Sequence, residues 1–219
     1  TALEKGEISE NRLAESVKKV LKTKYLLGLQ NLKSINSENI NEDLNNASHA
    51  ELSEKLYSNA ITLLKDEKNL LPLSCSETYY YLPLEEAPFQ TFVENLNLGA
   101  AVKLMLRSEI AQIPENSTVI VGFHKDNSTA YKSYKISQES KDILAELSKK
   151  QNVILDVFGS PYALKDVDIS KISTVLVSYE NNDLSLKASA KALLGKTKIH
   201  GKLPVIVNEN LKAGSGIAR

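Results

Sequence analysis

The feature that most constrains this fold is a set of three short, almost continuously apolar runs, separated by segments with helical periodicity. The runs span residues 118–123, 153–158 and 174–179 and are rich in Val, Ile and Leu. Apolar runs of this length are typical of strands that are covered on both faces. Because strand and helix patterns alternate, the sequence predicts right-handed βαβ units and a mainly parallel sheet.

Further elements extend the alternation. Strands are expected at 79–82 and 101–104, after a β-rich run at 61–64, and helices at 88–96, 107–112, 137–150, 161–165 and 184–194. A capping box formed by Ser48 and Glu51 predicts that a helix begins at Ser48. The predicted fold class is therefore α/β: a three-layer α/β/α sandwich with a mainly parallel sheet and a flavodoxin-like outline, spanning residues 48–207.

The N-terminal region does not follow this alternation. Residues 1–29 predict one amphipathic helix, capped by Ser9 and ended by Gly28. This detached helix has no element of its own to pack against, so we assign it to a preceding domain. Residues 30–47, rich in Asn and Ser, predict an irregular linker, and residues 208–219 predict a flexible C-terminal connector.

Composition excludes several functional classes. Lys+Arg and Asp+Glu are both 27, so the formal net charge is zero, and no dense basic stretch indicates nucleic-acid binding. The single cysteine, Cys75, excludes an internal disulfide framework and a multi-cysteine zinc site. We see no cluster of metal ligands, no motif for a cofactor and no apolar run long enough to span a bilayer. We therefore expect no metal, no cofactor, no nucleic-acid partner and no membrane span.

Ligands of open parallel sheets bind beyond the carboxyl ends of the strands. There, His124 and Asp126 predict a general acid–base pair, or else only polar loop residues. Gly159 and Ser160 open a helix and predict amides that hold an anion or a sugar hydroxyl, or else a tight turn. Glu180 predicts a sugar ligand, or else a solvated carboxylate. These five residues are the candidate substrate-binding set.

Two other interpretations are disfavoured. A cysteine nucleophile needs a base partner, and all three histidines lie far from Cys75 in the sequence. A phospho-acceptor receiver domain needs acidic residues at its strand ends, whereas the first two strong strands here end in His124 and Gly159.

Three ordered stretches resemble the C-terminal part of glycoside hydrolase family 3. The first, Lys24-Tyr25-Leu26-Leu27-Gly28-Leu29 with the helix before it, resembles the end of the family's last barrel helix. The second resembles the opening of its sandwich domain and runs from Asn59 to Asp66, then through Leu70-Leu71-Pro72-Leu73. The third comprises Val157-Phe158-Gly159-Ser160-Pro161-Tyr162, Tyr179-Glu180, Ala192-Leu193-Leu194-Gly195 and His200-Gly201-Lys202-Leu203-Pro204-Val205.

The resemblance implies a retaining glycosidase, with a carboxylate nucleophile and an acid–base group near the scissile bond. Within that family, this sequence is similar to the β-N-acetylhexosaminidase branch. In that branch the Asp nucleophile and a His–Asp acid–base pair lie on the (β/α)8 barrel. The β-glucosidase branch instead takes a Glu from the sandwich domain, and Glu180 does not match that motif. The resemblance therefore places no catalytic residue in this chain, and the chain alone is expected to be inactive.

The expected function is that of the accessory C-terminal domain of a retaining β-N-acetylhexosaminidase acting on N-acetylglucosamine-containing glycans. Its expected partners are an N-terminal (β/α)8 barrel, the glycan, and a downstream β-lactamase-like domain, with which residues 212–217 are compatible. The resemblance is compatible with a periplasmic or cell-surface location, although the chain itself fixes no compartment. Two alternatives stay open: an independent flavodoxin-like domain that binds a small ligand or a partner, and a sandwich domain reduced to a scaffold.

Overall fold

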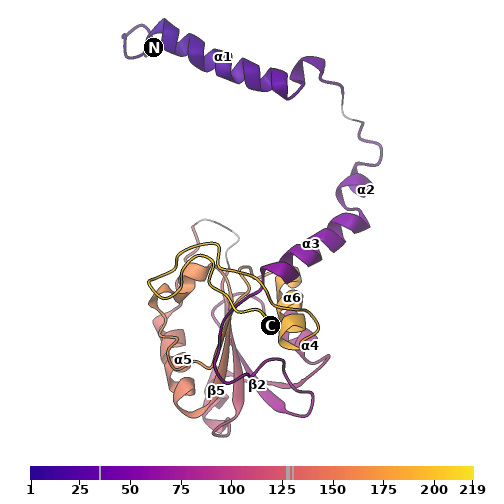
Figure 1. The fold of residues 1–219 in the computed structure, drawn as a ribbon, viewed down its shortest axis with the longest axis vertical. Helices are drawn as coiled ribbons and strands as arrows, with labels where there is room; N and C mark the ends of the chain where they lie inside the picture. Colours follow the sequence, from indigo (N-terminus) through magenta and orange to yellow (C-terminus); the bar gives the residue numbers. More distant parts are fainter. Residues whose placement is uncertain (35, 127–128, 130) are drawn as a thin grey trace. The chain divides into compact units, whose positions relative to one another are not determined.

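The computed structural model describes every residue except 35, 127, 128 and 130 (Figure 1). It divides into two compact units, Thr1–Asn46 and Ala47–Arg219. None of the described helices is both long and apolar enough to cross a membrane.

The first unit is helical. Helix α1, Glu10–Leu26, begins where the Ser9 side chain accepts a hydrogen bond from the backbone N–H of Arg12. It is followed by Gly28, which has a φ of 73° and opens the short 3-10 helix η1, Leu29–Asn31. Both termini agree with the sequence patterns. The predicted irregular linker is only partly irregular, because it also contains the one-turn helix α2, Ile40–Leu44.

The second unit is built on a six-stranded sheet of order β1-β6-β5-β4-β2-β3. The five strands β2 to β6 run parallel, and β1 pairs antiparallel with β6 at one edge. The strands are β1 Thr62–Asp66, β2 Thr78–Leu84, β3 Ala101–Leu104, β4 Thr118–His124, β5 Asn152–Phe158 and β6 Thr174–Val177. The predicted α/β class with a mainly parallel sheet is confirmed.

Helices cover both faces of this sheet and give three layers. Figure 1 shows α5, Gln138–Lys150, on one face, and α4, Gln90–Leu96, with α6, Asp183–Leu193, on the other. Each face has its own apolar cluster, and the central strands β4 and β5, buried except at their first residue, contribute to both. Helix α3, Ala47–Ala60, packs against α6.

Several local features differ from the sequence patterns. Helix α3 begins at Ala47, so Ser48 lies inside its first turn and the predicted capping box does not define the start. The segments Arg107–Gln112 (η2) and Pro161–Asp166 (η3) are 3-10 rather than α-helical. Both are short connecting segments, a setting in which 3-10 turns are frequent.

The C-terminal segment also differs from the flexible connector expected for residues 208–219. The backbone N–H of Ile217 donates to the carbonyl of Leu63 at 2.7 Å, and Ile199 and Arg219 exchange two backbone hydrogen bonds. The Arg219 guanidinium donates to the carbonyl of Leu71. These long-range contacts make the segment part of the second unit.

Candidate functional site

The strand order identifies where a ligand site is expected. Without β1, the parallel strands have the flavodoxin-like order 2-1-3-4-5, whose topological switch point lies between β2 and β4. From this edge the chain continues into α4 on one face of the sheet after β2, and into α5 on the other face after β4 (Figure 1). All five residues predicted from the sequence lie in or beside loops at this edge.

His124, the last residue of β4, is fully buried and its ring stacks on Phe158, with 4.7 Å between centroids. Asn181 donates through Nδ2 to the carbonyl of Pro88 at 2.7 Å, so its Oδ1 accepts from Nδ1–H of His124 at 2.6 Å. Nε2 is then the acceptor of the Tyr81 hydroxyl proton. Burial lowers the pKa of His124 to about 4.

The predicted acid–base pair is therefore not formed. Both ring nitrogens of His124 are engaged by Tyr81 and Asn181, whereas Asp126 forms an ion pair with Lys132. His124 is instead a neutral linker that joins β2, β4 and the loop before α6. Through Asn181 it also fixes the loop that carries Pro88.

Lys125, which lies between His124 and Asp126 in the sequence, forms ion pairs with two carboxylates at this edge of the sheet. Its ammonium lies 3.0 Å from a carboxylate oxygen of Glu85 and 2.9 Å from one of Glu86. The Glu85 side chain is only 5% exposed. Burial would raise the pKa of Glu85, but hydrogen bonds from Ser140, Ser137 and Lys125 outweigh it and lower that pKa to about 2.

The remaining sequence candidates have structural partners as well. A Cβ at Gly159 would lie 3.1 Å from Cβ of Lys125, which accounts for the small residue there. The Ser160 hydroxyl caps η3 by accepting the N–H of Tyr162. Glu180 accepts the hydroxyl proton of Tyr57 at 2.6 Å and also a hydrogen bond from Asn182. A role in sugar binding for these residues stays a prediction.

One buried ionisable residue near this edge was not singled out by its sequence. Asp156, in the middle of β5, is fully buried and accepts hydrogen bonds from the hydroxyls of Ser178 and Ser189. Burial raises the pKa of Asp156 to about 6. Its only sequence signal is a single charge within an apolar strand.

Replacing Asp156 with Asn should remove a pH dependence of stability. A raised pKa means that the carboxyl favours folding fully below about pH 4, and that this contribution is lost as the pH rises through 6. Between pH 4.5 and 7.5, the variant should gain about 2 kcal/mol of unfolding free energy relative to the native protein. Urea denaturation at both pH values measures this difference, and His124 titrates in both proteins and cancels.

The exposed Asp142, on α5, provides the control. The unfolding free energy of Asp142→Asn should change between pH 4.5 and 7.5 by the same amount as that of the native protein. If the unfolding free energy of Asp156→Asn also changed by that same amount, the raised pKa assigned to Asp156 would be contradicted.

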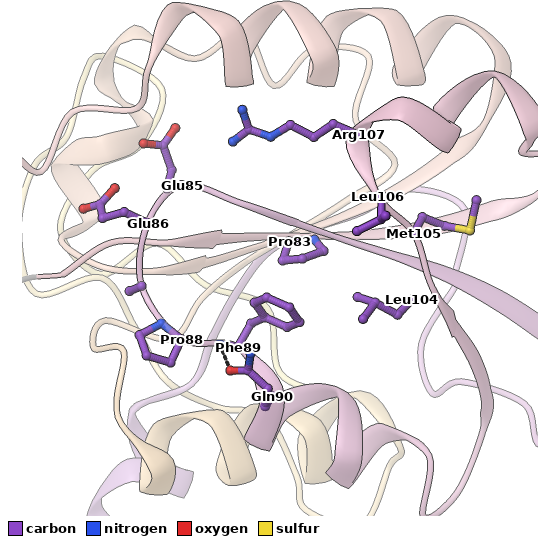
Figure 2. Close-up of a pocket in the computed structure, with 11 residues that line it drawn as sticks. Pro83, Glu85, Glu86, Pro88, Phe89, Gln90, Leu104, Met105, Leu106 and Arg107 are labelled. Carbon is purple, nitrogen blue, oxygen red and sulfur yellow. Dashed lines mark hydrogen bonds between the residues drawn. The ribbon is translucent and has the colours of Figure 1, made fainter.

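A cavity of about 420 Å³ opens beside the switch point, between the loops that follow β2 and β3. Figure 2 shows Phe89 facing Pro83 across it, with Glu85 and Glu86 at one end and Leu104 and Leu106 at the other. No sequence motif indicates this cavity, because its two walls are about twenty residues apart and have no recognisable spacing. Within the described residues, no group of three or more His, Cys, Asp or Glu side chains is placed to hold a metal ion.

Comparison with known proteins places this geometry in context. No family model matches the chain. It is 28% identical over 214 residues to β-glucosidase C of Emericella nidulans. This match covers 95% of this chain and 33% of that protein. It is 27% identical over 181 residues to the lysosomal β-glucosidase of Dictyostelium discoideum, covering 77% and 22% respectively. The chain thus spans a third or less of the length of these two curated relatives.

Solved structures agree in fold. A glycoside hydrolase family 3 β-N-acetylglucosaminidase from Paenibacillus superposes with a TM-score of 0.63 at 21% identity, covering 94% of this chain and 41% of that one. The curated relatives of this chain are β-glucosidases, and glycoside hydrolase family 3 enzymes are among the solved structures that share its fold. The predicted family 3 resemblance is confirmed. A β-glucoside phosphorylase, BglX, superposes with a TM-score of 0.70 at 20% identity, covering 96% and 42%.

Proposed function

We propose that this chain is the C-terminal α/β sandwich domain of a retaining β-N-acetylhexosaminidase that acts on N-acetylglucosamine-containing glycans. The observation that carries the domain assignment is the extent of similarity, which covers 95% of this chain but only 33% of β-glucosidase C. The β-N-acetylhexosaminidase branch is supported by the sequence resemblance and by the fold shared with the Paenibacillus β-N-acetylglucosaminidase. The other parts of such a protein then hold the reacting groups, in line with the barrel location that the sequence resemblance implies.

The arrangement at the carboxyl edge supports the inactivity of this chain on its own. A retaining glycosidase needs two carboxyl groups about 5–5.5 Å apart, free to reach the scissile bond. Here Lys125 forms ion pairs with both Glu85 and Glu86, and Asp156 is buried beneath the edge. Glu180 is held by Tyr57 and Asn182. This arrangement favours a structural or binding role over bond cleavage.

The first unit supports the domain assignment. Leu13, Val17, Leu21 and Tyr25 recur along α1 at helical spacing, and all are more than 40% exposed. An apolar helix stripe of this kind normally packs against another element. We therefore assign residues 1–29 to the last helix of a (β/α)8 barrel and 30–47 to the linker. A downstream β-lactamase-like domain stays a prediction.

A chromogenic N-acetyl-β-glucosaminide assay on the 219-residue chain tests its predicted inactivity. We expect release of the chromophore no faster than with a heat-killed sample, while cooperative urea unfolding shows that the assayed chain is folded. Steady turnover above the heat-killed control would overturn this part of the proposal.

A further inference from the structure

We propose that Arg219 and Asp66 form a latch that holds residues 214–219, hereafter the C-terminal strap, against β1, and that the strap opens as a unit when the latch is broken. This inference is independent of the proposed function. The latch lies at the amino edge of the parallel sheet, because Asp66 pairs with Thr174, the first residue of β6. The candidate site lies at the opposite, carboxyl edge.

The strap covers the edge of a strand. β1 is an edge strand of the six-stranded sheet, and Ile217 of the strap forms an antiparallel bridge with Leu63 of β1. The backbone N–H and C=O groups of an uncovered edge strand can pair with a strand of another chain, and a covering segment prevents this. Opening the strap would therefore uncover a surface for strand pairing.

Apolar burial contributes little to holding the strap in place. None of its six residues, all of which the structure describes, is buried, and its largest apolar side chain, Ile217, is 43% exposed. Its backbone is held by the N–H of Ile217, which donates to the Leu63 carbonyl, and by two hydrogen bonds that Arg219 and Ile199 exchange. Because burial of apolar surface is the main force that keeps a segment folded, closure of the strap depends on its polar contacts.

The Arg219 guanidinium supplies these contacts at the end of β1 and in the turn that follows it. It donates to the Leu71 carbonyl through Nε at 3.1 Å and also through Nη2. Its Nη1 donates to Oδ1 of Asn69 at 3.1 Å, and its Nη2 lies 3.3 Å from Oδ2 of Asp66. A planar guanidinium can serve all three groups at once because its N–H donors have a fixed fork geometry.

Asp66 makes the latch depend on a cation. Its side chain is only 2% exposed, and its Oδ1 accepts from the backbone N–H of Leu70 at 2.9 Å and from the Thr174 hydroxyl at 2.8 Å. Within the described part of the chain, its Oδ2 accepts no hydrogen bond, so the ion pair with Arg219 balances its charge. A buried carboxylate that loses its cation is strongly destabilised. Removing the guanidinium therefore disfavours the closed strap, which keeps Asp66 buried.

Amide hydrogen exchange of the ¹⁵N-labelled 219-residue chain, measured by NMR where the rate reports the opening equilibrium, tests the inference. In Arg219→Met, the amides at positions 199, 217 and 219 should exchange about tenfold faster, since losing hydrogen bonds from a charged group shifts an equilibrium by about that factor. Exchange in β4 should be unchanged, because the strap opens without the core. The matched control, Lys212→Met, removes the same charge from an exposed position just before the strap and should change these rates by less than twofold.

Two further variants identify the latch itself. Asp66→Asn should accelerate the same three amides, and the double variant with Arg219→Met should exchange no more than about twofold faster than the faster single variant, because both changes break one contact. Gly216→Ala provides the reference for an open strap, since a Cβ there would lie 2.5 Å from the Gly201 carbonyl oxygen and prevent closure without touching the latch.

A change of less than twofold at positions 217 and 219 in Arg219→Met would overturn the inference, as would additive acceleration in the double variant. Equal acceleration in β4 would also overturn it, because the strap would then open only when the whole domain unfolds. If Asp66→Asn fails to fold, Arg219→Met and Gly216→Ala still decide the test. The two variants must accelerate the same amides, and different sets of amides would contradict the latch.

Discussion

Replacing Gly122 with alanine should destabilise the sandwich domain by about 3 kcal/mol or more. A Cβ at this position of β4 would lie 2.3 Å from Nε2 of His124 and 2.8 Å from the Tyr81 hydroxyl. Both side chains are fully buried, so one of them must move and leave a polar group without its partner. Overpacking and a buried unsatisfied group each cost about 1–3 kcal/mol. Urea denaturation monitored by circular dichroism measures the loss.

Gly99→Ala provides the matched control. The atoms nearest to a Cβ at Gly99 are the terminal methyl carbons of Leu194, 3.0 and 3.1 Å away, which can rotate aside. We expect that variant to lose less than about 1 kcal/mol. Equal losses in the two variants would show that the bond between Tyr81 and His124 is not what requires a glycine at position 122.

Replacing Lys125 with methionine should cost about 3–5 kcal/mol at pH 7, because it leaves the buried Glu85 carboxylate without its cation. In the native protein the lowered pKa of Glu85 stabilises the fold above the usual glutamate pKa, and this contribution is lost as the pH falls towards 2. Without Lys125, Glu85 takes up a proton at a higher pH. The deficit of the variant should therefore shrink between pH 7 and pH 4, which denaturation at a series of pH values measures.

Two further variants make this prediction specific. The double variant Lys125→Met with Glu85→Gln should recover at least about 1 kcal/mol of the loss, since the buried charge is then removed and the remaining carboxylate, Glu86, is half-exposed to water. Lys132→Met removes an ion pair with Asp126 that is partly exposed, and should cost less than about 1 kcal/mol. A deficit of Lys125→Met that is independent of pH would contradict the role given to the buried carboxylate.

The strands were predictable because their signal is local. The apolar runs at 118–123 and 153–158 correspond to β4 and β5 within one residue at either end. Alternation with helices then predicted parallel pairing, since the crossover geometry follows from element order. Helix starts were less predictable. Ser9 caps α1, whereas the equally plausible cap at Ser48 lies inside α3.

The edge of the sheet that carries the candidate site was predictable, but the partners of its side chains were not. His124 and Asp126 are two residues apart, so their pairing was the obvious expectation. In the structure, however, His124 is the last strand residue and lies buried in the core. Its partners Tyr81 and Asn181 are 43 and 57 residues away. Contacts between distant segments leave no spacing pattern in a single sequence, and the Phe89 cavity was missed for the same reason.

The central proposal is that the reacting groups lie outside this chain, on a barrel whose last helix is residues 1–29, within one longer polypeptide. The most direct measurement compares hydrolysis of a chromogenic N-acetyl-β-glucosaminide by that longer polypeptide and by residues 1–219, at equal concentrations. We predict turnover by the longer polypeptide only. Turnover by residues 1–219, or none by a folded longer polypeptide, would contradict the account.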